Sequence, residues 1–584
     1  EGTQADVVLP ASFEGGTYAV GEYAFYKNTS LTSVTIPAGV TAVGKYAFAY
    51  CANLRTAVVG SDVTGIGQYA FYGCNALQSL SLPFAGERAD GTGSTHFGFI
   101  FGADTYAQNE RYVPKALRSV TVAGGNIAPY AFADCGGIVR LTLGSGVLSV
   151  GAEALRTCSR LAEVVNLSSL ALEAGSQENG CVALYARAVY TSADAESKVR
   201  ETEDGFLYFV GEEGLLLFGY AGGRTEVALP ELLEGETYIL ASYAFAGLED
   251  VEEVTVPNGV RQIERYAFYG SSLQSLSLPY VGASPDGEIS HFGYIFGAET
   301  YGENITSVPA SLQQVFVSQG YIAENAFRGC ESLLRVSLGS GVDGVQSYAF
   351  GNCSSLQEIS LCEGLSRIEN YAFIGCGALQ AISLPASVSY LGDGVFQNCT
   401  SLGSIVLPDA LTSVPSFAFS GCISLAEVTF GDGILSIGNN AFEHCSRLAE
   451  LSIPEGVTDI GSYAFDGCTS LVGVRLPASL AQFDLNVFQN CSSLREIVVA
   501  EDNPAYSSAD GVLFNKDKSE VVLYPAGRTI TSYIVPAGVL SVGAKAFRGN
   551  LHLKDVILPE GLESLGENAF DGCLRLESIA LPAS

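Results

Sequence analysis

Residues 379–402 read LQAISLPASVSYLGDGVFQNCTSL, and the spacing of their apolar residues decides the fold of most of the chain. Allowing for the variants found elsewhere, the stretch follows the pattern LxxIxLPxxVxxIGxxAFxxCxxL. Within each run the pattern recurs every 23 residues, which is the sequence signature of a repeat architecture. Its phenylalanines are Phe25, Phe48, Phe71, Phe132, Phe245, Phe268, Phe327, Phe350, Phe373, Phe396, Phe419, Phe442, Phe465, Phe488, Phe547 and Phe570.

Each part of the unit predicts a piece of local structure. The alternation at 382–384 predicts a short strand with its serine facing outward, and Pro385 ends that strand because it has no N–H to donate. Gly392 permits a tight bend. We expect a helical or 3₁₀ turn around Phe396, and Asn398 indicates a further turn.

One such unit cannot bury its own apolar face, whereas stacked units bury theirs against one another. Stacking places the short strands side by side, so that they form one long parallel sheet. The predicted fold is therefore an α/β solenoid of 23-residue coils with a long parallel β-sheet, short strands and helical or 3₁₀ turns.

The unit resembles the BspA-like class of bacterial leucine-rich repeat. The resemblance rests on the Leu-Pro, Ile-Gly, Ala-Phe and Cys positions of the pattern above. The chain departs from the general leucine-rich repeat in having Pro where the strand exits and no column of Asn. The resemblance implies a leucine-rich-repeat solenoid and a bacterial surface protein that adheres to host proteins or other cells.

Two kinds of insert interrupt the repeat. The first kind occurs at 84–113 and 280–308, where the copies HFGFIFGADTY and HFGYIFGAETY begin at His96 and His291. The second kind, at 204–220 and 510–524, has two apolar runs around a polar turn, which predicts a β-hairpin.

The inserts and an internal duplication divide the chain. We expect a first repeat array at 1–170 and an irregular segment with a hairpin at 171–226. A second array follows at 227–584, with inserts at 280–308 and 499–530. The final Leu581-Pro582-Ala583-Ser584 matches interior copies, so we expect the second array to be truncated, with any anchor beyond it.

Composition excludes several classes of protein. The formal net charge is −33, from 29 Lys and Arg against 62 Asp and Glu, which opposes binding of nucleic acid or anionic membrane. Apolar residues make up 48%, which excludes disorder, and no apolar run is long enough to insert into a membrane. There are four His and no recognisable catalytic motif, so we expect no enzyme activity and no cofactor.

The cysteines form a column, three residues after the phenylalanines. Four interpretations are open: buried thiols that pack as small apolar groups, a ladder of disulfides, a row of metal ligands, or a redox store. A straight line of thiols suits neither the tetrahedron around Zn²⁺ nor disulfide geometry, so we favour buried thiols. Cys181 and Cys362 lie off the column, and their redox state stays open.

The first kind of insert offers a second candidate site. His96 could pair with Asp104, and His291 with Glu299, at a ligand pocket. The alternative is that the aromatic residues and glycines of the insert fill the core where a coil is lengthened.

The outward positions of the strands are the best candidates for binding. An acid and, two residues later, a hydroxyl recur on one face of the sheet, and stacking would align them into two columns. The alternative is that small polar residues suit an exposed sheet and acids confer solubility. The candidates are Glu253, Glu358, Glu427, Glu450, Glu496 and Asp555 for the acids, and Thr255, Ser337, Ser360, Ser383, Thr429 and Ser452 for the hydroxyls.

These observations lead to a non-enzymatic, secreted or cell-surface recognition protein that presents a rigid face to a macromolecule, and the acids on that face would suit a basic partner. One alternative is a structural stalk that displays a missing domain. Another is the non-catalytic part of a larger surface enzyme.

Overall fold

The computed structural model describes residues 4–287 and 289–582. The chain forms two compact units: Glu1–Gly222 with Tyr238–Ala246, and Gly223–Thr237 with Gly247–Ser584. Ala583 and Ser584, the end of the interior match noted above, lie outside the described residues. The division into two arrays around 171–226 stays a prediction.

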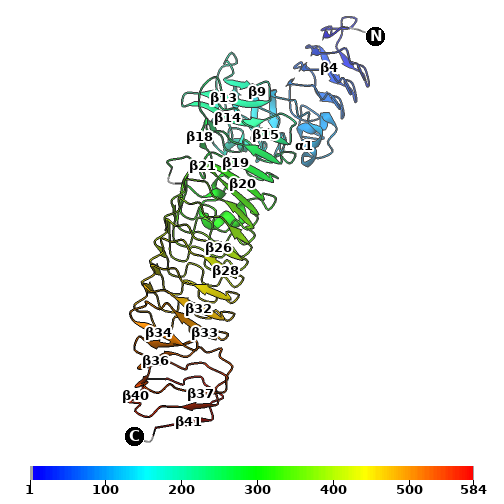
Figure 1. Ribbon diagram of the computed structural model, residues 1–584. Coiled ribbons are helices and arrows are strands. Elements are labelled where there is room, and N and C mark those ends of the chain that lie inside the picture. Colours follow the sequence, from blue (N-terminus) through cyan, green and yellow to red (C-terminus); the bar gives the residue numbers. More distant parts are fainter. Residues whose placement is uncertain (1–3, 288, 583–584) are drawn as a thin grey trace. The chain divides into compact units, whose positions relative to one another are not determined.

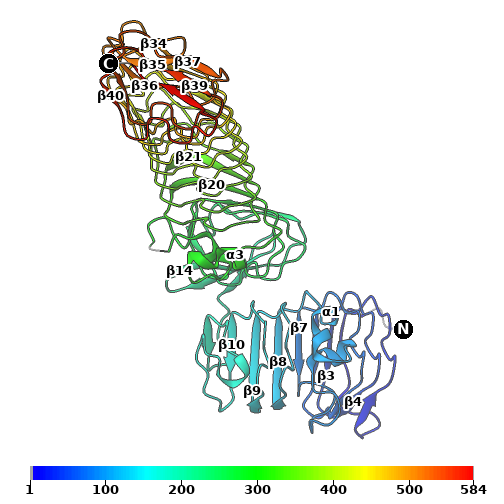
Figure 2. The ribbon, with the colours of Figure 1, turned by 90° about the horizontal axis from the view of Figure 1, so that it is seen from below.

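The first unit is built on an eight-stranded sheet of parallel neighbours, seen side by side in Figure 2. Each strand pairs with the equivalent strand of the next coil, as Val34 does with Ala57. The predicted parallel solenoid is thereby confirmed. In order, the strands are β1 (Asp6–Val8), β3 (Ser33–Ile36), β5 (Thr56–Val59), β7 (Ser79–Leu82), β8 (Ser119–Ile127), β9 (Arg140–Val150), β10 (Glu163–Asn166) and β11 (Ala188–Tyr190).

The second unit repeats this arrangement over more coils, where Figure 1 shows short strands following one another along the chain. Its main sheet comprises β15 (Glu226–Ala228), β17 (Glu253–Thr255), β19 (Ser275–Leu278), β20 (Gln314–Ile322), β21 (Arg335–Val345), β22 (Glu358–Ser360) and β24 (Ala381–Ile382). Later coils contribute β26 (Ser404–Val406), β28 (Glu427–Thr429), β30 (Glu450–Ser452), β32 (Gly473–Leu476), β33 (Glu496–Val499), β37 (Ser532–Ile534), β39 (Asp555–Ile557) and β41 (Ser578–Ala580). Proline directly follows β7, β19 and β32, as the sequence predicted.

A second set of short strands, which sequence analysis did not predict, lies at the Val-x-x-Ile-Gly part of the unit. These strands also pair in parallel from coil to coil, as Ile437 does with Ile460. They are β2 (Tyr18–Val20), β4 (Val40–Val43), β6 (Gly65–Ile66), β18 (Val260–Ile263), β23 (Arg367–Ile368), β25 (Tyr390–Leu391), β27 (Ser413–Val414), β29 (Ser436–Ile437), β31 (Asp459–Ile460), β38 (Ser541–Val542) and β40 (Ser564–Leu565).

The glycine after these strands is required for a different reason from the one expected. A Cβ atom on Gly392 would lie 2.3 Å from the backbone nitrogen of Asn370 in the preceding coil. The same collision, at 2.5 Å, would occur between Gly438 and Ser416. The assignment of Gly392 to a tight bend is therefore corrected: the glycine lets neighbouring coils approach.

The aromatic segment of each coil is a pair of turns. Cys399 N donates to Phe396 O at 3.1 Å, and Gln397 N donates to Gly394 O at 3.0 Å. Residues 394 and 398 have φ of 61° and 60°, so left-handed residues on either side of Phe396 prevent a helix from continuing. Asn398 fits this position because Asn tolerates the left-handed region, which confirms the predicted turn.

Phenylalanine rings form the centre of the core. From Phe327 to Phe488, each ring stacks on the ring of the next coil, with centroids 5.1–5.6 Å apart and planes within 16° of parallel. Phe396 is fully buried, and its backbone N–H donates to Ala418 O of the next coil at 2.8 Å. Stacked rings and backbone hydrogen bonds thus join every coil of this run to its neighbours.

Both hairpin predictions are confirmed. In the first unit, β13 (Phe206–Gly211) pairs antiparallel with β14 (Gly214–Tyr220) and with β12 (Val199–Glu201), and β14 pairs parallel with β16 (Tyr238–Leu240). In the second unit, β35 (Val512–Asn515) pairs antiparallel with β34 (Tyr506–Ala509) and with β36 (Glu520–Leu523). The segment expected to be irregular also contains α2 (Glu178–Cys181) and the sheet strand β11.

The two aromatic inserts have matching structures. One contains η1 (Phe97–Phe101), η2 (Tyr106–Gln108) and α1 (Asn109–Tyr112), and the other contains η3 (Phe292–Phe296), η4 (Tyr301–Glu303) and α3 (Asn304–Ser307). The Phe97 ring packs against the core ring of Phe132, with the ring centroids 4.5 Å apart and the planes tilted by 31°. The fully buried Asn109 accepts a hydrogen bond from Gly98 N and donates to the carbonyls of Ala131 and Ala133. The amide thus replaces the hydrogen bonds that a regular coil would supply.

Replacing Phe396 with alanine should lower the free energy of unfolding by about 3–5 kcal/mol, because it removes a ring that packs between two others. Urea denaturation followed by circular dichroism measures the loss. The matched control is Val406→Ala, whose side chain is 63% exposed and whose loss should change stability little. Equal effects of the two substitutions would contradict the ring column as the core.

Candidate functional site

The candidate site is the outer face of the main strands, defined as the acid position and the hydroxyl position two residues later. On β22, β28 and β30 both positions are exposed, while the residue between them points inward. Ile359 and Leu451, for example, are buried between exposed neighbours. The alternation arises because successive strand residues point to opposite sides of a sheet.

The structure places all twelve predicted face residues on this outer face. Among the acids, Glu358, Glu427, Glu450 and Glu496 are exposed, and Glu253 and Asp555 are half-buried. Among the hydroxyls, Thr255, Ser360, Ser383, Thr429 and Ser452 are exposed, and Ser337 is half-buried.

Neither column is continuous. At the acid position, the neighbours of Glu358 are Arg335 and Ala381, and the neighbour of Glu450 is Gly473. Ser337 and Ser360 do lie side by side at the hydroxyl position. Elsewhere that position carries exposed apolar side chains that were not predicted, although the repeat spacing marks them; they include Phe316, Val406 and Ile534.

A groove lies on this face at β22 and β24. It has a volume of about 520 Å³ and contains three of the predicted residues. The lining residues are Gln357, Glu358, Ile359, Ser360, Leu361, Glu363, Gln380, Ala381, Ile382, Ser383 and Pro385. Carboxylates, amides and hydroxyls around the groove can accept and donate hydrogen bonds, while the aliphatic side chains supply apolar contact.

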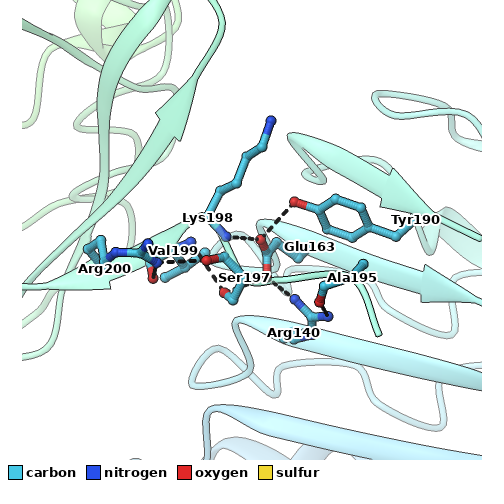
Figure 3. A network of polar contacts seen from close by, with 8 residues as sticks. All are labelled: Arg140, Glu163, Tyr190, Ala195, Ser197, Lys198, Val199 and Arg200. Carbon is cyan, nitrogen blue, oxygen red and sulfur yellow. Dashed lines mark hydrogen bonds and ion pairs between the residues drawn. The ribbon is translucent and has the colours of Figure 1, made fainter. Parts of the chain in front are cut away.

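In the first unit, sequence analysis missed an acid at the same strand position. Glu163 on β10 is opposite Arg140 on β9, and its side chain is fully buried (Figure 3). Its carboxylate accepts hydrogen bonds from Arg140 Nη1 at 2.6 Å and from the Tyr190 hydroxyl at 3.0 Å. The signal that could have revealed it is the 23-residue step from Arg140, which puts Glu163 in the acid column.

The remaining partners of this network come from residues 191–198, which we call the strap. Ser197 Oγ and Lys198 N each donate to the Glu163 carboxylate at 2.8 Å, and Arg140 Nη2 donates to Ala195 O at 2.7 Å (Figure 3). A buried charge is stable only when it is paired and fully hydrogen-bonded, and the strap supplies half of those bonds.

The histidines of the inserts do not pair with the acids. His96 Nε2 hydrogen-bonds with Ala103 O at 3.1 Å, and Asp104 accepts from Gln68. In the second insert, His291 Nε2 lies 3.4 Å from Ala298 O, and Glu299 forms an ion pair with an arginine. Burial lowers the pKa of His291. Both rings therefore close the insert turn, which agrees with the alternative that the insert fills the core.

The cysteine column consists of free thiols, as sequence analysis favoured. Its members are buried except for the half-buried Cys573; off the column, Cys362 is buried and Cys181 is half-buried, and both are free thiols. Along most of the column the Sγ donates to the carbonyl of a phenylalanine in the preceding coil, as from Cys422 to Phe396 O at 3.1 Å. Burial raises the pKa of Cys422 to about 12, so the thiols are neutral and unreactive at ordinary pH.

Tyrosines form a separate ladder on the first coils. Tyr46 stacks on Tyr23 at 5.0 Å and on Tyr69 at 4.8 Å, with planes within 10° of parallel. Lys45 Nζ lies 5.5 Å from the centre of the Tyr46 ring. Because the ring faces contact each other, they pack between coils instead of presenting a flat surface to a ligand.

Residues 4–287 and 289–582 lack both a metal-ligand cluster and a membrane-spanning helix. In this part of the chain, no cluster of three His, Cys, Asp or Glu residues is placed to hold a metal ion. No helix within it is both long enough and apolar enough to cross a bilayer.

The repeats match a known family. The sequence profile of the BspA type leucine rich repeat region matches in six copies, which together cover more than half of the chain. The chain belongs to this family. The matched residues are 9–89, 117–176, 225–284, 320–446, 391–509 and 524–584. The repeats of the BspA-type protein described here thus extend through both units. A comparison with curated protein sequences found no match.

One solved structure similar to this BspA-type chain is a leucine rich cell surface protein from Faecalibacterium prausnitzii. The two sequences are 21% identical, the match covers 67% of this chain and 78% of that chain, and the TM-score is 0.30. The pneumococcal vaccine antigen PcpA is also similar, with 20% identity and a TM-score of 0.26; the match covers 66% of this chain and 71% of that chain. A leucine-rich repeat protein from Bacteroides ovatus has 20% identity and a TM-score of 0.20; the match covers 84% of this chain and 86% of that chain.

The buried thiols predict a loss of stability in alkali. Folding holds their pKa above the unfolded value of 9.0, so the unfolded chain loses protons first as the pH rises. Stability is therefore fully present below pH 9 and falls above it, by about 1.4 kcal/mol per thiol and pH unit. Urea midpoints between pH 8 and pH 11 measure this slope.

A control separates thiols from other titrating groups. A variant with Cys399, Cys422 and Cys445 replaced by alanine should be less stable at pH 8 but lose less stability per pH unit above 9. Identical slopes for the two proteins would contradict the role of thiol ionisation.

Glu163→Ala should release the strap, because its bonds to Ser197 and Lys198 are lost. Limited trypsin digestion should then cut after Lys198 or Arg200 several times faster than in the parent protein. Glu153→Ala is the matched control, since the Glu153 side chain is half exposed and forms a surface ion pair with nearby Arg156. Unchanged cleavage in Glu163→Ala would show that other contacts hold the strap.

Proposed function

We propose that this protein is a non-enzymatic recognition protein, secreted or held at the cell surface, whose outer sheet face binds another protein. The observation that carries the proposal is the face itself: exposed acids and hydroxyls recur at fixed positions on many coils, with exposed apolar residues between them. Such a mixture of polar and apolar groups on a stiff support suits a protein partner.

Electrostatics supports a basic partner. The chain carries a net charge of −33, and the face adds Glu427 and Glu450 on successive coils. Complementary charge would speed association and discriminate against acidic proteins. Repetition of the face along the coils would also allow several weak contacts with one extended partner to act together.

A surface location draws on membership of the BspA-type family. Adhesion to host proteins or other cells would follow from that location. A stalk that displays another domain, and the non-catalytic part of a larger surface enzyme, are the alternatives. Neither would require the exposed apolar residues Phe316 and Val406 on the outer face.

Glu427→Lys combined with Glu450→Lys should weaken binding of basic extracellular matrix proteins by about tenfold or more, because both side chains lie on the face and are exposed. Biolayer interferometry against a panel of purified basic and acidic matrix proteins measures the change, and thermal melting checks that the fold is intact.

The control carries the same change in net charge away from the strands. Glu331 and Asp502 are exposed and lie in turns, so Glu331→Lys with Asp502→Lys should leave binding largely unchanged. If both pairs weaken binding equally, net charge and not the face determines it, and the proposal fails.

A further inference from the structure

The network of Glu163 has a counterpart in the second unit. Residues 140–147 read RLTLGSGV and residues 335–342 read RVSLGSGV, in each case followed one coil later by a glutamate. Arg140 is opposite Glu163 on β9 and β10, and Arg335 is opposite Glu358 on β21 and β22. The two arginine–glutamate pairs therefore occupy the same position in the duplicated sequence.

In the first unit, this pair binds polypeptide. Arg140 donates to the carbonyl of Ala195, and Glu163 accepts from the N–H of Lys198 and from the hydroxyl of Ser197. The pair thus contacts one carbonyl, one backbone N–H and one side-chain hydroxyl within four consecutive residues of the strap (Figure 3). Two of these three contacts are to main-chain atoms and do not depend on the side chain that the strap presents.

In the second unit, the equivalent pair is open. The side chains of Arg335 and Glu358 are 57% and 65% exposed, and Arg335 Nε lies 3.9 Å from Glu358 Oε2. The corresponding side chains of Arg140 and Glu163 are 19% and 0% exposed. Glu358 lines the groove of about 520 Å³ described above.

The next strand explains why the groove stays open. In the first unit, β11 places Ala188 opposite Glu163 and then Tyr190, whose hydroxyl bonds to the glutamate. In the second unit, β24 places Ala381 opposite Glu358, and the position equivalent to Tyr190 is the smaller Ser383. Pro385 then turns the chain into the next coil, where the first unit continues toward the strap.

We propose that the groove at Glu358 binds an extended peptide segment of another protein in the way that the Glu163 pair binds the strap. Arg335 donates to a backbone carbonyl of the peptide, and Glu358 accepts from a backbone N–H and from a serine or threonine hydroxyl. The groove is also lined by Gln357, Gln380 and Ser383, whose side chains can form further hydrogen bonds with a bound peptide. The inference rests on the proposed function and names the ligand class for one part of the outer face.

The test uses the strap itself as the probe. A fluorescein-labelled peptide of residues 191–201, TSADAESKVRE, is titrated with the full chain and followed by fluorescence polarisation. We expect saturable binding that weakens by about tenfold or more in Glu358→Gln and in Arg335→Gln, as for loss of a hydrogen bond to a charged group. A peptide with alanine in place of Ser197 should also bind more weakly.

The matched control is Glu331→Gln, an exposed turn residue that should leave the affinity unchanged. Absence of saturable binding by the parent chain would overturn the inference. So would equal affinity of the parent and Glu358→Gln, which would mean that the peptide binds elsewhere, for example by displacing the strap.

The two proposals fail separately. The peptide titration compares the parent chain with Glu358→Gln and uses no basic protein. Its result is therefore independent of the binding experiment that tests the face as a whole. If Glu427→Lys with Glu450→Lys weakens binding of basic proteins but the peptide does not bind, the proposed function stands and the inference about the groove falls.

Discussion

Stacking of each coil on the next is the constraint on which the rest of the structure depends. At the centre of the repeat, the Phe396 ring lies between two other rings, its backbone N–H bonds to the next coil, and the thiol of Cys422 bonds back to its carbonyl. These contacts join neighbours in sequence, so stability accumulates coil by coil and does not require a single large core. The same spacing explains Gly392, where any side chain would collide with the preceding coil.

Interruptions of the repeat are bridged by buried asparagines. Asn109 and Asn304 each bond to backbone groups where an aromatic insert lengthens a coil. Asn550 occupies a cysteine position after the second hairpin, where it donates to three carbonyls and accepts from two N–H groups. A thiol can make one weak hydrogen bond, whereas an amide can bond several groups at once, so the amide suits a coil whose neighbour is irregular.

The outer face follows from the same geometry. Side chains that alternate with the core must point outward, and the repeat brings equivalent side chains together. Such a position is exposed or buried depending on whether another segment of the chain covers it. Glu163 lies beneath the strap, whereas Glu358, at the matching position, lines an open groove. A closely similar local pattern therefore holds the chain's own segment in the first unit and is exposed in the second.

The solenoid, the parallel strands ending at proline, the hairpins and the buried thiols could all be predicted from the sequence, because each depends on a spacing of 23 residues or on a short-range pattern. It also placed Glu358, Glu427 and Ser383 on one face, since alternation along a strand is a local property. Tertiary contacts alone decided two outcomes that no pattern predicted: His96 bonds to a carbonyl and not to Asp104, and residues 191–198 cover Glu163. Both contacts involve segments that do not follow the 23-residue repeat. Neither the period of the repeat nor its residue types specifies where such an irregular segment returns to the sheet.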